Sequence, residues 1–297
     1  MIRGSIVAIA TPFKEGKIDE HCLRELVKFQ ITNGTNGIVP CGTTGESPTL
    51  THDEHHRVIE LCIETAEGKV PIIAGTGSNS TAEAVSLTQH AAKAGATAAL
   101  IVSPYYNKPT QEGLFRHFKT IADSSPIPII LYNIAGRTGV NIETPTVVRL
   151  ANACKNIIGV KEASGSLEQM KSVKESCPKG FLLLSGDDAL TLPVLKMGGS
   201  GVISVAANII PQDIVRIITA FEGGKHDEAE AAFNKTLPLV KSLFLETNPI
   251  PVKTAMGMLG MCSGDVRLPL CEMSEENQKK LKQALTDYGL IKLERVS

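Results

Sequence analysis

The residue whose type and position suggest the most demanding chemistry is Lys161, which directly follows the apolar run 157–160. A lysine amine attacks a carbonyl carbon only in its uncharged form, and burial in the mouth of a fold lowers the pKa of the ammonium group toward that form. The alternative is a lysine that reaches from a strand end into solvent, and position alone favours neither. Lys161 is therefore our candidate nucleophile for Schiff-base formation.

Hydroxyl side chains occur at the ends of several similar apolar runs. Tyr132 ends one run, and Thr43 and Tyr106 closely follow two others; three of the four tyrosines lie at such ends, at 105, 106 and 132. Phenol and alcohol groups relay protons in carbinolamine and enamine steps without adding a competing charge. Each tyrosine taken alone is more typical of a rim aromatic, but the group predicts that Tyr132, Thr43 and Tyr106 converge on Lys161.

A cationic side chain follows the run that ends in Tyr132. Arg137 lies in Gly136-Arg-Thr-Gly139. A guanidinium group can hold a substrate carboxylate through two parallel hydrogen bonds. An arginine that bridges loop carbonyls fits the same position equally well, so both interpretations stay open from these residues alone.

The elements that must position these residues are short apolar runs that alternate with helical patterns, which is typical of a parallel sheet with crossover helices. We expect eight strands, at 5–10, 37–40, 71–74, 98–102, 128–132, 157–161, 181–185 and 201–204. Nearly continuous apolar runs indicate strands that are buried on both faces. The predicted fold is α/β, a (β/α)8 TIM barrel, with an open doubly wound sheet as the rival. In such a barrel the functional groups project from the carboxyl ends of the strands, where the residues above lie.

Several predicted helices carry recognisable start signals. Residues 51–54, 80–83 and 166–169 each fit a capping box, in which two side chains satisfy free backbone N–H groups reciprocally. Thr144 is expected to cap a helix whose first residue is Pro145.

The eight units end near residue 224, so we expect a barrel over residues 1–224. Residues 225–297 look purely helical, with a break around Asn248-Pro249, and are predicted to form a C-terminal helical extension packed on the barrel. Apolar residues make up 42% of the chain and charged residues 21%, a composition that argues against disorder. The net charge of −1 provides no field that would attract nucleic acid or a membrane surface, so the expected partner is a small molecule.

Metal, cofactor and export signals are weak. The seven cysteines form no Cys-x-x-Cys pair, and no stretch approaches the roughly 20 apolar residues that span a bilayer. The motif His52-Asp-Glu-His55-His56 lacks a third ligand cluster, and Gly75-Thr-Gly-Ser-Asn-Ser80 lacks the third glycine and the later acid of a dinucleotide site. A phosphate site after the last two strands is disfavoured by Asp187 and Asp188. We therefore expect a cytoplasmic protein with no metal, no cofactor, and no nucleic-acid or membrane partner.

Five motifs together carry a family resemblance: Gly42-Thr-Thr-Gly-Glu-Ser47, Pro104-Tyr-Tyr106, Tyr132-Asn133, Gly136-Arg-Thr-Gly139 and Gly159-Val-Lys-Glu162. From Gly4 to about residue 290 the chain resembles the 4-hydroxy-tetrahydrodipicolinate (dihydrodipicolinate) synthase family, lyases among the pyruvate-dependent class I aldolases. The resemblance implies condensation of pyruvate with L-aspartate 4-semialdehyde, the committed step of diaminopimelate and lysine biosynthesis. A sister aldolase acting on N-acetylneuraminate or a keto-deoxy sugar, or a non-catalytic barrel that senses an oxo acid, are the alternatives.

The same resemblance implies roles for individual residues. Lys161 would form the imine with pyruvate, and Tyr132 would act as acid and base, with Thr43 relaying protons to a Tyr106 inserted from a neighbouring subunit. The residues implied in substrate binding are Thr44 for the pyruvate carboxylate, Arg137 for the semialdehyde carboxylate, and the backbones of Gly186 and Ile203. The family also implies a homotetramer built from two tight dimers.

Feedback inhibition by L-lysine is a further implication. The positions that match the family's lysine site are Ser47, His52, His55, Asn79, Glu83 and Tyr105. Two residues depart from the usual pattern: Ala135 stands where proline precedes Gly-Arg, and Pro48 replaces an alanine beside the lysine site.

Overall fold

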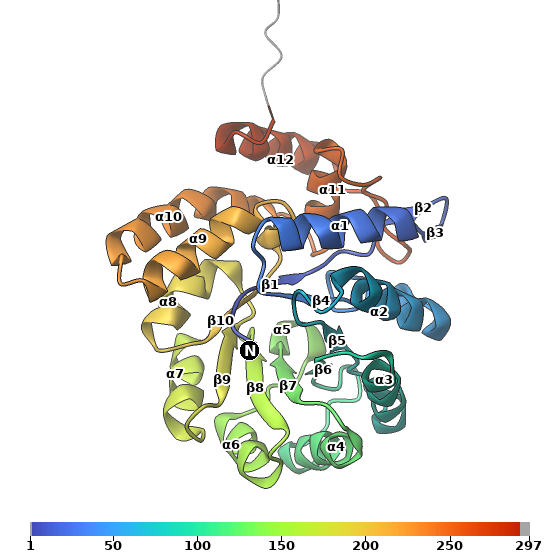
Figure 1. Cartoon of the computed structure of the whole chain (residues 1–297), viewed down its shortest axis with the longest axis vertical. Coiled ribbons are helices and arrows are strands. Elements are labelled where there is room, and N and C mark those ends of the chain that lie inside the picture. Colours follow the sequence, from blue (N-terminus) through green and yellow to red (C-terminus); the bar gives the residue numbers. More distant parts are fainter. Residues whose placement is uncertain (1, 292–297) are drawn as a thin grey trace, which may run out of the picture.

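Eight parallel strands form one sheet in the computed structural model, which describes residues 2–291. The strands are β1 (Gly4–Ala8), β4 (Gly37–Val39), β5 (Ile73–Gly75), β6 (Ala98–Val102), β7 (Ile129–Asn133), β8 (Ile157–Glu162), β9 (Leu182–Ser185) and β10 (Gly201–Ser204). Their order around the sheet is β4-β1-β10-β9-β8-β7-β6-β5 (Figure 1). All eight predicted strands are confirmed, with ends that differ by at most two residues.

The barrel closes between β4 and β5, the two ends of this order. Ile38 forms a parallel bridge with Ile72. The Ile38 N–H donates to the Pro71 carbonyl at 3.0 Å, and the Gly75 N–H donates to the Pro40 carbonyl at 3.0 Å. An open sheet would leave both edge strands unpaired. The seam therefore rules out the doubly wound alternative.

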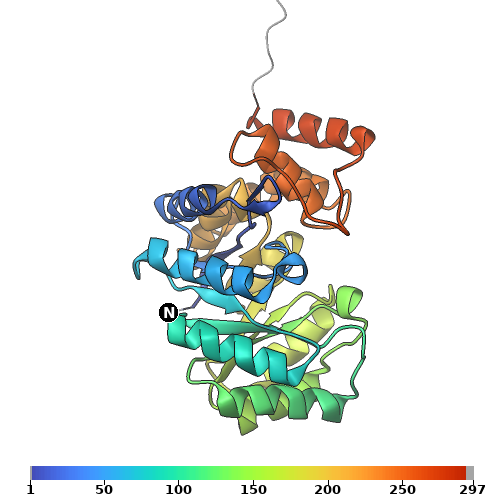
Figure 2. The same cartoon turned by 90° about the vertical axis from the view of Figure 1, so that its right-hand side faces the viewer.

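Helices form an outer layer around the barrel (Figures 1 and 2). One helix follows each barrel strand: α1 (Glu20–Thr32), α2 (His52–Ala66), α3 (Thr81–Ala94), α4 (Gln111–Ser124), α6 (Thr144–Ala153), α7 (Leu167–Ser176), α8 (Thr191–Lys196) and α9 (Pro211–Glu222). The short elements between them are β2 (Phe13–Lys14), β3 (Lys17–Ile18) and α5 (Ala135–Thr138), with 3-10 turns at Ser47–Thr49, Asp188–Leu190 and Ala206–Asn208.

The interior of the barrel is a separate apolar cluster from the layer under the helices. Its buried members are Ile2, Ile6, Ala8, Val39, Ile73, Ala98, Leu100, Ile130, Tyr132, Leu184 and Ile203. Successive side chains of a strand point to opposite faces, so a strand between a barrel interior and a helical layer must be apolar at nearly every position. This requirement explains why the strands read as continuous apolar runs in the sequence.

The capping predictions hold at one helix and fail at another. At α2 the Thr51 hydroxyl accepts from the Glu54 N–H at 3.2 Å, and the Glu54 carboxylate accepts from the Thr51 N–H at 3.0 Å. At α3 the predicted box is wrong, because the Ser80 side chain makes no cap hydrogen bond. The carboxylate that would complete that box, Glu83, instead contacts His52 at 2.8 Å. A tertiary contact has replaced the local one.

Two further starts differ from the expected boxes. Helix α6 begins at Thr144 itself, with Glu143 as its N-cap residue, one position earlier than predicted. At α7 the Ser166 hydroxyl accepts from the Gln169 N–H at 3.1 Å, which is one half of a box. The Gln169 side chain makes its hydrogen bonds elsewhere, to Asn141 among others.

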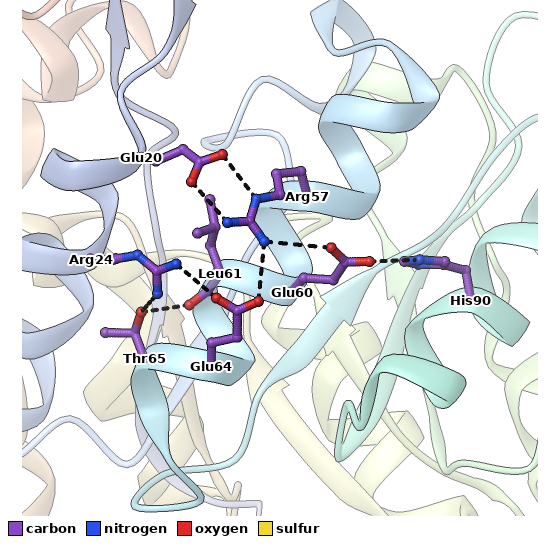
Figure 3. A network of polar contacts seen from close by, with 8 residues as sticks. All are labelled: Glu20, Arg24, Arg57, Glu60, Leu61, Glu64, Thr65 and His90. Atoms are coloured by element: carbon purple, nitrogen blue, oxygen red, sulfur yellow. Dashed lines mark hydrogen bonds and ion pairs between the residues drawn. The ribbon is translucent and has the colours of Figure 1, made fainter.

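A network of ion pairs links the helices on either side of the seam (Figure 3). Arg57 of α2 donates to Glu20 of α1 through two nitrogens, each at 2.9 Å, and to Glu64 at 3.1 Å. Glu60 of α2 contacts His90 of α3 at 3.2 Å. Partly exposed pairs stabilise a fold little one by one, but a network on one arginine is worth more. The network therefore links α1, α2 and α3 across the outside of the barrel.

The C-terminal region adds α10 (His226–Ser242), α11 (Ile250–Met258) and α12 (Glu275–Tyr288). Helix α10 lies beside α9, and α11 and α12 lie farther out, beyond α1 (Figure 1). The prediction of a purely helical tail is wrong for residues 259–274, which contain no helix. Gly260, two residues after the end of α11, has a φ angle of 69°, and such a left-handed position ends a helix. Among the helices of residues 2–291, none has the length and low polarity that crossing a membrane requires.

Candidate active site

Lys161 lies on β8 and points into the barrel. Its neighbours in the strand register are Tyr132 on β7 and Leu184 on β9, and both belong to the interior cluster. Only 6% of Lys161 is exposed, so its amine does not reach from the strand end into bulk water. The Nζ atom lies 4.1 Å from the centroid of the Tyr132 ring. The arrangement thus joins a sheltered amine and a phenol at the mouth of a closed barrel.

A cavity of about 460 Å³ opens at this mouth. Its lining includes Thr43, Tyr132 and Arg137, together with Ser47, His52, His55, Glu83 and Tyr105. Arg137, which is expected to bind substrate, therefore shares one continuous cavity with five of the six residues expected to bind lysine; Asn79 does not belong to its lining. Lys161, Thr44, Gly186 and Ile203 do not belong to the lining. Tyr132 itself lines the cavity, and its ring also contacts the Lys161 amine.

Tyr106 is not close to the other hydroxyls within one chain. It is 90% exposed and has a φ angle of 72°, a left-handed conformation that a tyrosine rarely adopts. Hydrogen bonds hold the surrounding loop in place: Asn79 Nδ2 donates to the Tyr105 carbonyl at 3.1 Å, and Asn107 Nδ2 donates to the Asn79 carbonyl at 2.9 Å. The expected convergence of Tyr106 on Lys161 is thus not made inside a single chain, and its insertion from a second subunit stays a prediction.

Asn248 joins Arg137 to Thr44, although the sequence pattern predicts only a helix break at this residue. The Arg137 Nη2 atom donates to the carbonyl of Asn248 at 2.9 Å. The Asn248 amide in turn donates to the Thr44 hydroxyl at 3.1 Å. Arg137 therefore bridges to a loop carbonyl, which was the alternative to a substrate-binding role. It also lines the cavity. Nothing in the local pattern around Asn248 signals these contacts.

A second link between the C-terminal region and the site could not be predicted from the sequence pattern either. Lys253 and Glu46 form an ion pair in which both side chains are fully buried. Burial lowers the pKa of Lys253, and the Glu46 charge opposes that shift. The Glu46 carboxylate also accepts from the Arg267 N–H at 3.0 Å. Since Glu46 is only two residues beyond Thr44, the pair anchors the substrate-side loop to α11.

Arg267 strengthens the same anchor. Its guanidinium donates to both oxygens of Glu54, at 2.7 and 2.6 Å, and lies 4.2 Å from the centre of the Phe13 ring. The hydrogen bonds from Arg267 lower the pKa of Glu54 to about 2. The carboxylate is therefore ionised, and the pair intact, throughout the neutral pH range.

Gly186 directly follows β9, and Ile203 lies on β10. The Gly186 N–H donates to the Glu162 carbonyl at 2.8 Å, and a Cβ atom at Gly186 would lie 2.5 Å from the Cβ of Ala163. Only glycine permits this close approach. Ile203 on β10 is 1% exposed and belongs to the interior cluster.

The polar groups expected to bind lysine have distinct environments. Glu83 accepts from Ser78 and contacts His52, and these hydrogen bonds lower its pKa. His55 is buried, and its Nε2 donates to the Gly75 carbonyl at 2.8 Å. Burial lowers the pKa of His55 to about 4, so this ring is neutral near pH 7. Within residues 2–291, no group of three or more His, Cys, Asp or Glu side chains is placed to hold a metal ion.

Comparison with known proteins gives consistent matches over nearly the whole chain. The dihydrodipicolinate synthetase family model matches residues 1–288. The 4-hydroxy-tetrahydrodipicolinate synthase of Syntrophus aciditrophicus is 59% identical over 98% of this chain and 100% of the relative. The crystal structure of dihydrodipicolinate synthase from Aquifex aeolicus superposes with a TM-score of 0.96 at 50% identity, covering 97% of this chain and 99% of that one.

Two other solved structures have ligands named in their descriptions. A chloride-inhibited dihydrodipicolinate synthase from Acinetobacter baumannii was solved in complex with pyruvate; it is 45% identical, with a TM-score of 0.95, over 98% of this chain and 100% of that one. The enzyme from Cyanidioschyzon merolae was solved with lysine bound; it is 42% identical, with a TM-score of 0.95, over 97% of this chain and 99% of that one.

Proposed function

We propose that Lys161 forms an imine with pyruvate in the reaction of this enzyme. The chain belongs to the dihydrodipicolinate synthetase family and acts as a 4-hydroxy-tetrahydrodipicolinate synthase, a lyase of diaminopimelate and lysine biosynthesis. The sister aldolases and the sensing barrel are not favoured. The observation that carries the proposal is the sheltered Lys161 amine 4.1 Å from the Tyr132 ring centre. The proposed scheme needs no cofactor, because the substrate pyruvate itself is bound covalently to Lys161.

The proposed reaction begins when the uncharged Lys161 amine attacks the C2 carbonyl of pyruvate. Tyr132 donates a proton to the carbinolamine oxygen, and water leaves to form the imine. Loss of a methyl proton then gives an enamine, whose terminal carbon attacks the aldehyde of L-aspartate 4-semialdehyde. The amine of the semialdehyde displaces Lys161 by transimination, which closes the ring and regenerates the free amine.

Binding of the two carboxylates is assigned to Thr44 and Arg137. Thr44 would hold the pyruvate carboxylate, and the backbones at Gly186 and Ile203 would line the pyruvate pocket. Arg137 would hold the semialdehyde carboxylate, which agrees with its place on the cavity wall. A guanidinium that already donates to a backbone carbonyl retains further N–H groups for a carboxylate.

We further propose that two subunits build each site. Thr43 lines the cavity beside Tyr132, whereas Tyr106 projects outward with 90% of its surface exposed. A Tyr106 from the partner subunit would complete the proton relay from Thr43, in a homotetramer of two tight dimers. The cytoplasm is the proposed location, because seven free cysteines suit a reducing compartment.

Reduction with borohydride tests the assignment of Lys161. Borohydride converts an imine into a stable amine, so wild-type protein incubated with pyruvate and borohydride is expected to gain the mass of one reduced pyruvate. Peptide mass spectrometry should place that mass on Lys161, whereas the exposed Lys155 should stay unmodified. A protein that gains no mass, or gains it on another lysine, would contradict the proposal.

L-Lysine is the proposed regulator, bound by Ser47, His52, His55, Asn79, Glu83 and Tyr105. The Glu83 carboxylate lines the cavity with His52, His55 and Tyr105, and it can pair with an ammonium group. A relative at 42% identity was solved with lysine bound. His55, neutral and buried, would contribute shape and not charge to the site.

Substitution of Glu83 tests this regulatory site. Glu83→Gln keeps the size of the side chain but removes its charge, so we expect L-lysine to bind about 10- to 100-fold more weakly by calorimetry. Turnover of the variant should resist L-lysine concentrations that inhibit wild type. Glu276→Gln, on the exposed face of α12, is the matched control. If millimolar L-lysine neither binds wild type nor slows it, the regulatory proposal is wrong.

A further inference from the structure

The residues that follow Tyr132 and Lys161 form a pair of their own. In the register between β7 and β8, Tyr132 is opposite Lys161 and Asn133 is opposite Glu162. Because successive side chains of a strand point to opposite faces, Asn133 and Glu162 lie on the helix side of the barrel wall. Both are fully buried. Two polar groups are thus enclosed directly behind the proposed reacting pair.

Glu162 is held entirely by neutral N–H donors. Its carboxylate accepts from Asn133 Nδ2 at 3.0 and 3.2 Å, from Gln169 Nε2 at 2.9 Å and from the Ser164 N–H at 2.8 Å. A buried carboxylate costs several kcal/mol unless hydrogen bonds satisfy its oxygens. Since this group only accepts, each neighbour must present a donor toward it. The amide side chains of Asn133 and Gln169 must therefore turn their NH₂ groups, and not their oxygens, toward Glu162.

The Asn133 side chain is fixed in that orientation by the backbone of Ile142 and the side chain of Asn141. Its Oδ1 accepts from the Ile142 N–H at 2.9 Å, and its Nδ2 also donates to Asn141 Oδ1 at 2.7 Å. Reversing the amide would lose these bonds and turn an oxygen toward Glu162. Residues 140–142 follow the C-cap residue Gly139 of α5, the short helix that carries Arg137. One network consequently joins the strands of Lys161 and Tyr132 to the segment after Arg137.

We propose that Asn133 and Glu162 are positioning residues that set the separation between the Lys161 amine and the Tyr132 phenol. This inference rests on the proposed roles of Lys161 and Tyr132. Neither outward residue touches substrate; each acts through the inward residue that precedes it in the chain. A displacement of about 1 Å at reacting groups lowers a rate by on the order of 10²-fold, so a small shift of one strand is enough to matter.

Two single variants and their combination test the pair. Glu162→Gln places an NH₂ group where the N–H groups of Asn133 and Gln169 need an acceptor. Asn133→Asp places a second carboxylate against that of Glu162. Each is expected to lower kcat about 10- to 100-fold while the KM for pyruvate stays within about threefold. The double variant restores a donor and an acceptor between residues 133 and 162, but it still sets the new carboxylate at position 133 against the Asn141 Oδ1 atom that Asn133 donates to. Its kcat should therefore recover only in part, to a value above that of either single variant.

The kcat values of the variants and of wild type must be compared per folded molecule. Thermal unfolding gives the folded fraction, and the rate of borohydride trapping at Lys161 reports imine formation directly. A purely structural role would lower the folded fraction and leave kcat per folded molecule unchanged, and that result would overturn the proposal. Failure of the folded double variant to recover would also overturn it. If wild type itself is not trapped at Lys161, the proposed function fails first, which separates the two ideas.

A milder variant keeps the test decisive if the single variants do not fold. Gln169 is only half-buried and supplies one of the hydrogen bonds to Glu162. Gln169→Ala is expected to lower kcat about fivefold with little change in KM, and unchanged turnover of this variant would count against the proposal. Glu168→Ala, the exposed neighbour on the same helix, is the matched control and should behave as wild type.

Discussion

Replacing Lys161 with methionine is expected to lower turnover by a factor on the order of 10⁴ or more, because no other group can form the imine on which the proposed reaction depends. Methionine fills nearly the same volume in the 6%-exposed position, so the barrel should stay folded. Turnover of pyruvate and L-aspartate 4-semialdehyde, followed by a coupled assay, measures the effect.

The control for this experiment is Lys155→Met, which alters an exposed lysine just before the same strand. It should leave turnover and borohydride trapping at the wild-type level. A folded Lys161→Met protein that kept a tenth of wild-type turnover would show that another group performs the chemistry. The proposal would then have to be abandoned, even though the family assignment would stand.

Replacing Lys253 with methionine is expected to lower the free energy of unfolding by about 3–5 kcal/mol, the usual effect of removing one partner of a buried ion pair. Glu46 would keep a carboxylate in a site where neither side chain has any exposed surface. An unpaired buried carboxylate destabilises the folded state by more than the intact ion pair stabilises it. Urea unfolding at one fixed protein concentration, followed by circular dichroism, measures the loss.

Removing both charges should reverse most of this loss. The double variant Glu46→Gln with Lys253→Met leaves no unpaired charge, and such replacements are often close to neutral. The control is Lys280→Met, which breaks an exposed pair with Glu276 and should change stability by less than about 1 kcal/mol. A Lys253→Met protein as stable as wild type would mean that the anchor between Glu46 and α11 contributes nothing.

This anchor gives the region after the barrel a place in the site. We propose that residues 225–291 form an extension packed on the barrel, and that its function is to hold the loop after β4; residues 292–297 of the predicted extension lie outside the described residues. Asn248 contacts Thr44 and Arg137, while Lys253 holds Glu46 two residues farther along the same loop. The two residues proposed to bind substrate carboxylates therefore depend on a segment far away in the chain.

The barrel, and the direction in which Lys161 and Tyr132 point, could be predicted from the sequence by itself. Both follow from local rules: strands buried on two faces are apolar at nearly every position, and neighbouring side chains alternate between faces. The capping box at Thr51 is of the same kind, since its partners are three residues apart. Interactions within a few residues leave a periodic or motif-like trace in the chain.

Only the tertiary structure decided the contacts that complete the site. Asn248 and Thr44 are 204 residues apart, and Lys253 and Glu46 are 207 apart, so no local pattern records either contact. Glu83 shows the same effect in reverse, because a neighbouring helix drew it away from the cap that its spacing predicted. Packing brings such residues together through the summed burial of many apolar side chains, and no single one of those side chains identifies the polar partners that result.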